Sequence, residues 1–356
     1  MTKPRICIVG PGVVGQATGK VFAAKGFDTT FLGRTREKVD KLISLGYKAY
    51  TKEELINGTY DFDITMFTVP TPTVNGKIDL SAINEASIDL GKRIKFMKKY
   101  HLAVVKSTVP PGTTENLVLK NLEKYSGKKV GQDFGLCMNP EYLREEFAFD
   151  DTLNAWTITI GEYDKKSGDM LEALYETFSS PVHRVKIAEA EMQKYVHNLF
   201  NAAKISFFNE MREIASALNL DANKIFNITA ASAEGMWNPK YGTRDRGPYS
   251  GSCLPKDTKA FREWAQDNGH NVSLLEAVMK VNDTILSRLD PVQSKLISQT
   301  QERTKRLTQE KSNGHVQNKS VRPIQPVRQA QDKQAQDLQT QDEGQSTEKE
   351  ILGAAL

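Results

Sequence analysis

A glycine-rich turn near the start of the chain restricts its fold more than any other feature. The apolar run Ile6–Val9 is typical of a buried strand, and Gly10-Pro11-Gly12-Val13-Val14-Gly15 follows it directly. Residues 16–24 then carry the pattern of a helix. Between a strand and a helix, the spacing G-x-G-x-x-G is the fingerprint of a dinucleotide site, because its glycines make the turn, admit a pyrophosphate and let the helix pack closely on the strand. The sequence therefore predicts a Rossmann-like fold.

Apolar runs alternate with helical patterns through the first half of the chain. The expected strands are residues 5–9, 29–32, 63–69, 102–106, 134–138, 156–160 and 182–185. The expected helices are residues 13–25, 35–45, 81–99 and 114–125. Such alternation favours an α/β fold in which a doubly wound, mostly parallel sheet is covered by helices on both faces.

A different pattern begins near residue 188. Residues 189–219 contain no Gly or Pro and repeat apolar positions at helical spacing, which predicts one long helix. Asp221 can cap a further helix that ends near Ala231. After a loop over residues 232–255 we expect two more helices, at 256–267 and at about 272–290. These segments predict an all-α central domain.

The end of the chain differs again in composition. Residues 291–345 are rich in Gln and charged residues and contain no aromatic residue. Such a segment cannot bury enough apolar surface to offset its ordering entropy, so we expect disorder beyond Asn313. The predicted domains are an NAD(P)-binding Rossmann-like domain over residues 1–187, a helical central and dimerisation domain over 188–290, and a low-complexity tail over 291–356.

Charge and apolar patterning exclude several classes of protein. The net charge of +4 is small for 356 residues and the basic residues are spread along the chain, which argues against a nucleic-acid partner. The three cysteines stand in dissimilar contexts and do not look like a disulfide framework. The first strand begins too early for a signal peptide, and no apolar run is long enough to span a bilayer. We expect a cytoplasmic protein without a membrane partner or a bound metal ion.

The residues after the second strand bear on the choice of cofactor. The fingerprint predicts an acidic residue about 20 residues on, which would bind the hydroxyls of the adenosine ribose. Gly33, Arg34 and Thr35 stand there instead. A guanidinium matches the oxygens of a 2′-phosphate, whereas a basic turn in solvent would look the same in sequence. The residues therefore leave both NAD and NADP open.

A second motif lies in the loop before the last predicted helices. Gly251-Ser252-Cys253-Leu254-Pro255-Lys256-Asp257 places a thiol among small residues with a cation behind it. A thiol beside a cation can be held as a thiolate, which attacks carbonyl carbons. Cys7 and Cys137, by contrast, lie in apolar runs and suit the core. We interpret Cys253 as a functional nucleophile.

Polar side chains also follow three of the predicted strands. The loops are Val69-Pro70-Thr71-Pro72, Lys106–Gly112 and Asn139–Glu145. Ligands of doubly wound sheets bind outside the carboxyl ends of the strands, so these loops are expected to share one crevice. On the long helix, Lys194 and Asn198 are four residues apart and share a face, where both could donate to an oxyanion. An ordinary solvated helix face is the alternative.

Together these motifs resemble the UDP-glucose/GDP-mannose dehydrogenase family. The order of Gly10-x-Gly12-x-x-Gly15, Val-Pro-Thr-Pro at 69–72, Ser-Thr-Val-Pro at 107–110, Asn-Pro-Glu-x-Leu-Arg-Glu at 139–145 and Gly-x-Cys-Leu-Pro-Lys-Asp at 251–257 carries the resemblance, which covers about residues 4–290. It implies a four-electron oxidation of the C6 alcohol of a nucleotide sugar to a uronic acid, with Cys253 forming a thiohemiacetal and then a thioester.

The resemblance also implies roles for individual residues. Catalytic roles fall to Cys253, Lys194, Asn198, Asp257, Glu145 and Thr108. The cofactor would contact Gly10, Gly12, Val13, Val14, Gly15, Arg34, Thr35, Val69, Pro70, Thr71, Ser107, Thr108, Glu141 and Lys256. The substrate would contact Glu141, Tyr142, Leu143, Arg144, Glu145, Lys194, Asn198, Tyr249 and Gly251.

Three departures from the family pattern qualify these expectations. Gly33 replaces the ribose-binding acid, which puts the NAD preference in doubt, and Ser250 stands where a glycine is usual. The family's third domain, which binds the nucleotide half of the substrate, is replaced here by the Gln-rich tail. Two other functions therefore stay open: a two-electron hydroxyacid-type dehydrogenase, and a degenerate binding protein. We also expect a homodimer that forms through the helix 189–219 and does not need the tail.

Overall fold

The computed structural model describes residues 3–56, 61–243, 247–251 and 253–289, so the predicted tail lies outside the described residues. Contacts divide the chain into two compact units, and the boundary between them in the sequence lies between Leu220 and Asp221. The first unit contains the sheet and also the long helix α8 (Ile187–Ala217). The proposed domain boundary between residues 187 and 188 stays a prediction.

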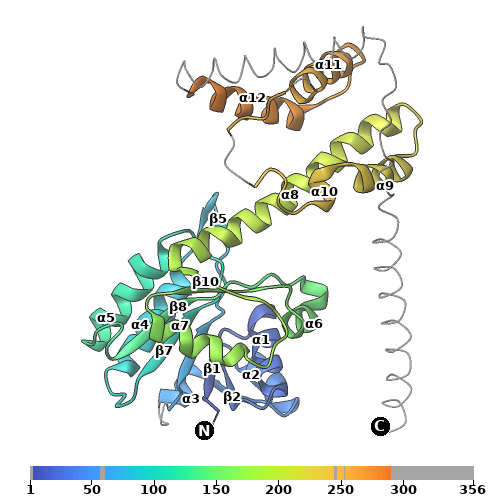
Figure 1. Cartoon of the computed structure of the whole chain (residues 1–356). Helices are drawn as coiled ribbons and strands as arrows, with labels where there is room; N and C mark the ends of the chain where they lie inside the picture. Colours follow the sequence, from blue (N-terminus) through green and yellow to red (C-terminus); the bar gives the residue numbers. More distant parts are fainter. Residues whose placement is uncertain (1–2, 57–60, 244–246, 252, 290–356) are drawn as a thin grey trace, which may run out of the picture. The chain divides into compact units, whose positions relative to one another are not determined.

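An eight-stranded sheet forms the centre of the first unit (Figure 1). Its strands run in the order β10-β9-β8-β7-β4-β1-β2-β3. They are β1 Ile6–Val9, β2 Thr29–Gly33, β3 Lys48–Thr51, β4 Ile64–Phe67, β7 His101–Val105, β8 Phe134–Met138, β9 Ile158–Glu162 and β10 Val182–Lys186. All neighbours are parallel except β8 and β9. The prediction of a mostly parallel, doubly wound sheet is confirmed.

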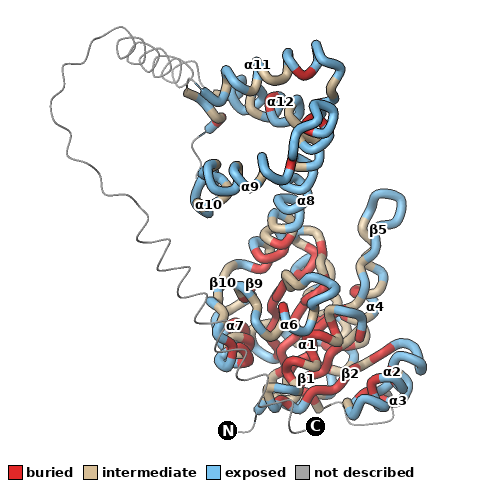
Figure 2. Tube along the Cα trace, turned by 90° about the vertical axis from the view of Figure 1, so that its right-hand side faces the viewer, coloured by how far each residue is buried: buried red, intermediate tan, exposed pale blue. Residues whose placement is uncertain are grey.

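The two faces of the sheet are covered by different helices. On one face, Ile8, Phe31 and Met66 pack with Phe22 of α1 (Val13–Ala24) and Leu42 of α2 (Arg36–Ser44). The other face has its own cluster, to which α4 (Ser81–Ile94), α5 (Lys120–Ser126) and the start of α8 contribute Ile83, Leu122 and Ile187. The buried positions gather in the strands and in these covering helices (Figure 2).

The strand order creates one switch point. From β1 the chain moves outward to β2 and β3, and it then returns to the other side of β1 to form β4. The connections that leave the carboxyl ends of β1 and β4 therefore diverge to opposite faces. In open α/β sheets this divergence opens a crevice in which ligands bind.

Several elements differ from the sequence-based expectations. The sequence did not indicate the edge strand β3 or the hairpin of β5 (Thr73–Val74) and β6 (Lys77–Ile78). It also missed short helices, which are α3 Lys52–Ile56, α6 Ala148–Leu153, α7 Lys165–Glu172 and, within the expected loop 232–255, α10 Glu234–Trp237. The expected helix 81–99 ends at Ile94, and Lys99 beyond it forms ion pairs with Asp61 and Asp63 at 2.7 Å each. The expected helix 114–125 begins with a π-helical turn, Thr114–Leu119.

The second unit, as far as it is described, consists of helices. They are α9 Ala222–Ser232, α10 Glu234–Trp237, α11 Leu254–Asp267 and α12 Ser273–Ser287. Asp221 caps α9 as predicted, since its side chain accepts hydrogen bonds from the backbone N–H groups of Asn223 and Lys224 at 3.0 and 3.1 Å. The helix expected over 256–267 begins two residues earlier, with Pro255 in its first turn.

Candidate functional site

A cavity of about 600 Å³ opens at the carboxyl ends of β1, β2, β4 and β7. It lies at the switch point of the sheet, within the first unit. The sequence-predicted residues that line it are Gly10, Gly12, Val13, Val14, Arg34, Thr35, Val69, Pro70, Thr71, Ser107, Thr108 and Glu141. The fold thus brings together residues that the sequence separates by up to 131 positions, from Gly10 to Glu141.

The glycine-rich turn fits a dinucleotide at this cavity. Gly12 is the N-cap of α1 and no side chain caps the helix, so the first N–H groups of α1 remain available for phosphate oxygens. A Cβ added at Gly12 would meet no atom within 4 Å, which leaves the backbone open to a ligand. Gly15 does not line the cavity, because it packs inward: a Cβ there would lie 2.4 Å from the carbonyl oxygen of Gly10.

Hydrogen bonds hold the loops after β4 and β7 together. The hydroxyl of Thr71 donates to the carbonyl oxygen of Thr108 at 2.7 Å, and the hydroxyl of Ser107 donates to that of Val69 at 2.6 Å. Both loops end strands that are neighbours in the sheet. This cross-linking gives the floor of the cavity a fixed shape.

The loop after β8 connects the cavity to α8. The carboxylate of Glu141 lies 2.9 Å from the ammonium of Lys194, whose side chain is only 5% exposed. The same ammonium donates to the backbone oxygen of Glu141 at 2.5 Å, and the N–H of Leu143 donates to the Glu141 carboxylate at 2.9 Å. Lys194 and Glu141, which the sequence indicated separately, therefore form one ion pair at the edge of the cavity, in which Lys194 is buried and Glu141 is partly exposed.

Lys106 also lines the cavity; the sequence placed it at the start of the loop after β7 but assigned it no role. Its ammonium is buried and donates to the side-chain and backbone oxygens of Asn139 at 2.9 and 3.3 Å. Burial lowers the pKa of Lys106 to about 8, and the positive charge of Lys194 acts in the same direction, while Glu141 opposes it. A single lysine at a strand end carries no pattern that would reveal this environment.

Other residues near the cavity have structural partners. Both carboxylate oxygens of Glu191 accept backbone hydrogen bonds, from Thr114 at 2.7 Å and from Gly112, so this acid holds the turn after β7. Arg144 binds Asp151 through two nitrogens, at 2.9 and 2.7 Å.

Two other predicted site residues are exposed. Glu145 begins a short 3₁₀ turn and is exposed. Asn198 is exposed on α8, one turn beyond Lys194.

Tyr142 packs beside α8. Its hydroxyl donates to the side-chain oxygen of Gln193 and lies 2.8 Å from the hydroxyl of Thr159, which can donate to it. Its ring lies 5.0 Å from the ring of His197, centroid to centroid. Burial is the main cause that raises the pKa of Tyr142, so its hydroxyl stays protonated at neutral pH and acts as a hydrogen-bond donor.

The cysteine loop belongs to the second unit, and its residues 251 and 253–257 are described. Cys253 is exposed and is the N-cap of α11, an end of a helix that favours negative charge. Lys256 and Asp257, in the first turn, form an ion pair that raises the pKa of Lys256, and Cys253 adds to the same effect. Tyr249 accepts a hydrogen bond from Asn282 of α12 at 3.3 Å, and Gly251 has a φ of 89°, which favours glycine.

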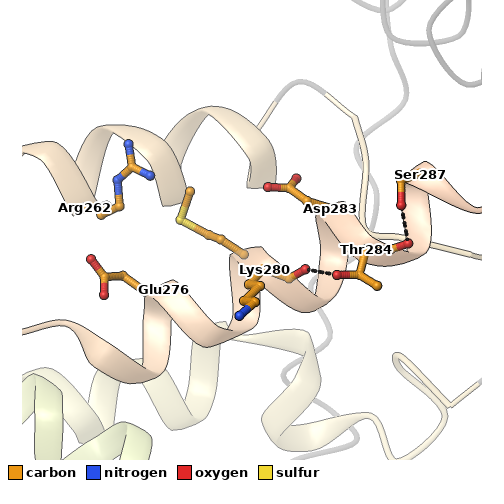
Figure 3. A pocket seen from close by; sticks show the side chains of 7 residues that line it. Arg262, Glu276, Lys280, Asp283, Thr284 and Ser287 are labelled. Carbon is orange, nitrogen blue, oxygen red and sulfur yellow. Dashed lines mark hydrogen bonds between the residues drawn. The ribbon is translucent and has the colours of Figure 1, made fainter.

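The second unit also has a cavity of about 460 Å³ between α11 and α12 (Figure 3). Arg262, Glu276 and Asp283 border it with their charged ends, and the hydroxyls of Thr284 and Ser287 bond to the backbone of their own helix. None of the predicted site residues lines it.

In the part of the chain that the structure describes, every helix falls short of the length and apolarity that a membrane span requires.

Comparison with known protein families gives two matches. The model of the NAD-binding domain of the UDP-glucose/GDP-mannose dehydrogenase family matches residues 45–179. The model of the central domain of the same family matches residues 188–284. The second match covers the cysteine loop and the long helix from its second residue on.

Curated relatives extend over most of the described chain. A GDP-mannose 6-dehydrogenase of Pseudomonas savastanoi pv. phaseolicola is 36% identical over 298 residues, which are 78% of this chain and 68% of the relative. A UDP-glucose 6-dehydrogenase of Haloferax volcanii is 31% identical over 303 residues, which are 78% of this chain and 69% of the relative.

Solved structures give the same picture. A ternary complex of GDP-mannose dehydrogenase from Pseudomonas aeruginosa has a TM-score of 0.75 at 32% identity, and the match covers 80% of this chain and 69% of that one. A UDP-glucose dehydrogenase from Pyrobaculum islandicum has a TM-score of 0.61 at 30% identity, with the same coverage.

Proposed function

The chain belongs to the UDP-glucose/GDP-mannose dehydrogenase family, and from this premise we propose that it oxidises the C6 alcohol of a nucleotide sugar to the carboxylate of a uronic acid. One observation carries the proposal: Thr108 and Glu141 line the same cavity as the glycine-rich turn, and Lys194 is bound to Glu141. A cation able to bind an oxyanion thus lies beside the cavity that we take as the site of the nicotinamide dinucleotide. When bound, each molecule of oxidised dinucleotide would accept one hydride, so the two oxidation steps would use two molecules in turn.

Lys194 is the residue that would stabilise negative charge on the substrate oxygen. An ammonium has three donors, and Glu141 accepts two of them, through its backbone oxygen and its carboxylate. One donor remains for the alkoxide of the alcohol and for the later oxyanions. Asn198, one turn further along α8, would add an amide donor on the same face.

Cys253 would carry the second half of the reaction. Its sulfur adds to the carbonyl carbon of the aldehyde, which forms a C–S bond and, after protonation of the oxygen, a thiohemiacetal. Loss of a hydride from that carbon to a second molecule of oxidised dinucleotide, together with loss of the hydroxyl proton, would give the thioester. Water then adds to the thioester carbon, the C–S bond breaks, and the acid and the cysteine are released. Asp257, Glu145 and Thr108 would position that water or take its proton.

Relatives named for GDP-mannose and for UDP-glucose match the chain over similar lengths, so both sugars are candidate substrates. The test is to incubate the full chain with NAD or NADP and a panel of nucleotide sugars, and to identify the product by mass spectrometry. We expect the uronic acid from at least one member of the panel. A product that stops at the aldehyde would favour the two-electron alternative, and binding without turnover would favour a binding protein.

A further inference from the structure

We infer that Arg34 and Lys38 form a 2′-phosphate site at the adenosine end of the cavity, so that the chain binds NADP in preference to NAD. The inference rests on the proposed function only in that it takes the cavity to be the dinucleotide site. Arg34 follows β2, Lys38 lies in α2, and both line the cavity together with Gly33 and Thr35.

The pairing of charges distinguishes these two cations from their neighbours. Arg36 is held by Asp40 at 2.7 Å and by Glu54, and Lys52 is held by Glu85 at 3.0 Å and by Asp89. Among the described residues, no carboxylate lies within 4.0 Å of the charged nitrogens of Arg34 or Lys38. Two exposed cations that form no ion pair with a described carboxylate thus border the cavity, and both can donate to the oxygens of a phosphate.

The structure also disfavours the residue that NAD-binding folds use at this point. An acid at the end of β2 accepts hydrogen bonds from the ribose hydroxyls. Gly33 occupies that position, and a Cβ built on it would lie 2.9 Å from Cγ2 of Val39 and 3.4 Å from Cγ of Pro11. Val39 is fully buried, so it has little room to move. A larger side chain at position 33 would therefore displace the start of α2 from the sheet.

The first turn of α2 adds donors to the site. Thr35 is the N-cap of this nine-residue helix, and its side chain makes no capping hydrogen bond. Its hydroxyl and the N–H groups of the first turn therefore remain available beside the two cations. Both kinds of donor match phosphate oxygens.

The alternative to this assignment is that an acidic residue of the cavity binds the ribose hydroxyls of NAD. Glu53, Glu85 and Asp89 also line it. Glu85 and Asp89 both bind Lys52, and the pKa of Glu85 is lowered mainly by that lysine, with a smaller effect from Arg34. If one of these carboxylates bound the ribose hydroxyls, NAD would be preferred and the neutral variant Glu85→Gln or Glu53→Gln would lose NAD affinity.

The experiment is to titrate the full chain with NADPH and with NADH, and to follow the fluorescence of the reduced nicotinamide. We expect NADPH to bind more tightly than NADH. Arg34→Ala and Lys38→Ala should each weaken NADPH binding by roughly tenfold or more, because each removes a charge-assisted hydrogen bond, and should change NADH binding by less than about threefold, since NADH lacks the phosphate. The NADPH affinity should also fall more steeply with increasing salt concentration than the NADH affinity.

Matched controls lie on the same helix. Arg36→Ala removes a guanidinium that the protein itself neutralises, and Lys41→Ala removes an exposed ammonium that does not line the cavity. Both should leave the two affinities unchanged. Tighter NADH binding, or equal losses for both cofactors in Arg34→Ala, would overturn the inference while leaving the proposed function intact. If neither cofactor bound, the proposed function itself would fail, and the inference with it.

Discussion

Lys194 connects the two halves of the proposed chemistry at the scale of a single residue. It is buried and pairs with Glu141, and in the proposed function its third N–H donor binds the substrate oxygen. We predict that Lys194→Ala lowers kcat by roughly a hundredfold or more, since the loss of one oxyanion donor typically raises the barrier by about 2.7–4 kcal/mol. Dinucleotide affinity should change little.

Steady-state kinetics and cofactor titration of the same variant check this prediction. Lys204→Ala, at an exposed position on the same helix, is the control and should keep its kcat. An unaltered kcat in Lys194→Ala, together with a large loss of stability, would return Lys194 to a purely structural role.

His101 makes a separate prediction about stability and pH. It is fully buried in β7, and its ring nitrogens lie 3.0 Å from the carbonyl oxygen of Phe62 and 2.9 Å from the hydroxyl of Thr65. Burial lowers the pKa of His101 to about 4 in the folded state, from 6.5. Because the unfolded chain binds the proton more readily, stability is lost as pH falls from about 6.5 towards 4.

The size of this effect follows from the two pKa values. Between pH 7 and pH 5 the group should remove about 2 kcal/mol from the free energy of unfolding. Urea unfolding at both pH values checks this. His101→Gln should lose about 2 kcal/mol less between them, whereas His183→Gln, at an exposed position, should behave like the unaltered chain. Equal pH dependence in all three proteins would refute the assignment.

At the scale of elements, the cap of α9 offers the clearest local test. Asp221 accepts hydrogen bonds from two backbone N–H groups at the start of the helix. Asp221→Ala should destabilise the helix by about 1 kcal/mol, which corresponds to about fivefold faster amide hydrogen exchange in α9 if the helix opens locally. Asp221→Asn keeps the acceptor and should exchange at the original rate. The same acceleration in both variants would mean that the cap is not the cause.

The elements also show what the sequence could predict and what it could not. Long apolar runs and long helical patterns were informative: the helix expected over 189–219 is observed at Ile187–Ala217, and it is followed by Asn219 in a left-handed conformation. The strand β3 was missed because its four residues alternate between exposed and buried positions at the edge of the sheet. Helix α7 was missed, although Asp164 caps it by accepting a hydrogen bond from Ser167.

The same limit applies to the cavity. The glycine-rich turn and the strand-end loops can be recognised in the sequence by their spacing, and the structure places residues from each of them on one cavity. Lys38 could not be found in this way, and Lys106, which begins one of these loops, was assigned no role. Lys38 is one of several cations on an exposed helix, and it differs from Lys41 of the same helix only in that it lines the cavity. Lys106 is distinguished only by its burial.

At the scale of the molecule, α8 carries more apolar surface than its own unit covers. Leu199, Phe200 and Ile205 are each about 60% exposed, at 62, 61 and 61%. Exposed apolar stretches of this kind usually mark an interface, and a two-fold contact between copies is the commonest solution. We predict a homodimer that forms through α8, and we expect a chain truncated after residue 312 to keep it.

Light scattering at micromolar concentration tests the dimer. Phe200→Glu places a charge in the proposed contact without disturbing a buried side chain, and it should give a monomer. Phe96→Glu, at a position that is 80% exposed and lies after α4, should remain dimeric. A monomer for the unaltered chain would refute the dimer, and a monomer for the truncated chain alone would show that the tail mediates it.

A four-electron oxidation that passes through Cys253 is tested by the stoichiometry of the reaction. With a limiting amount of the accepted nucleotide sugar, we predict two reduced cofactors for each uronic acid formed. Cys253→Ser should bind the cofactor normally but form no acid. Its reaction should stop after formation of the aldehyde or leave a slowly reacting ester. One reduced cofactor for each sugar consumed, or acid formation by Cys253→Ser at the original rate, would contradict the account.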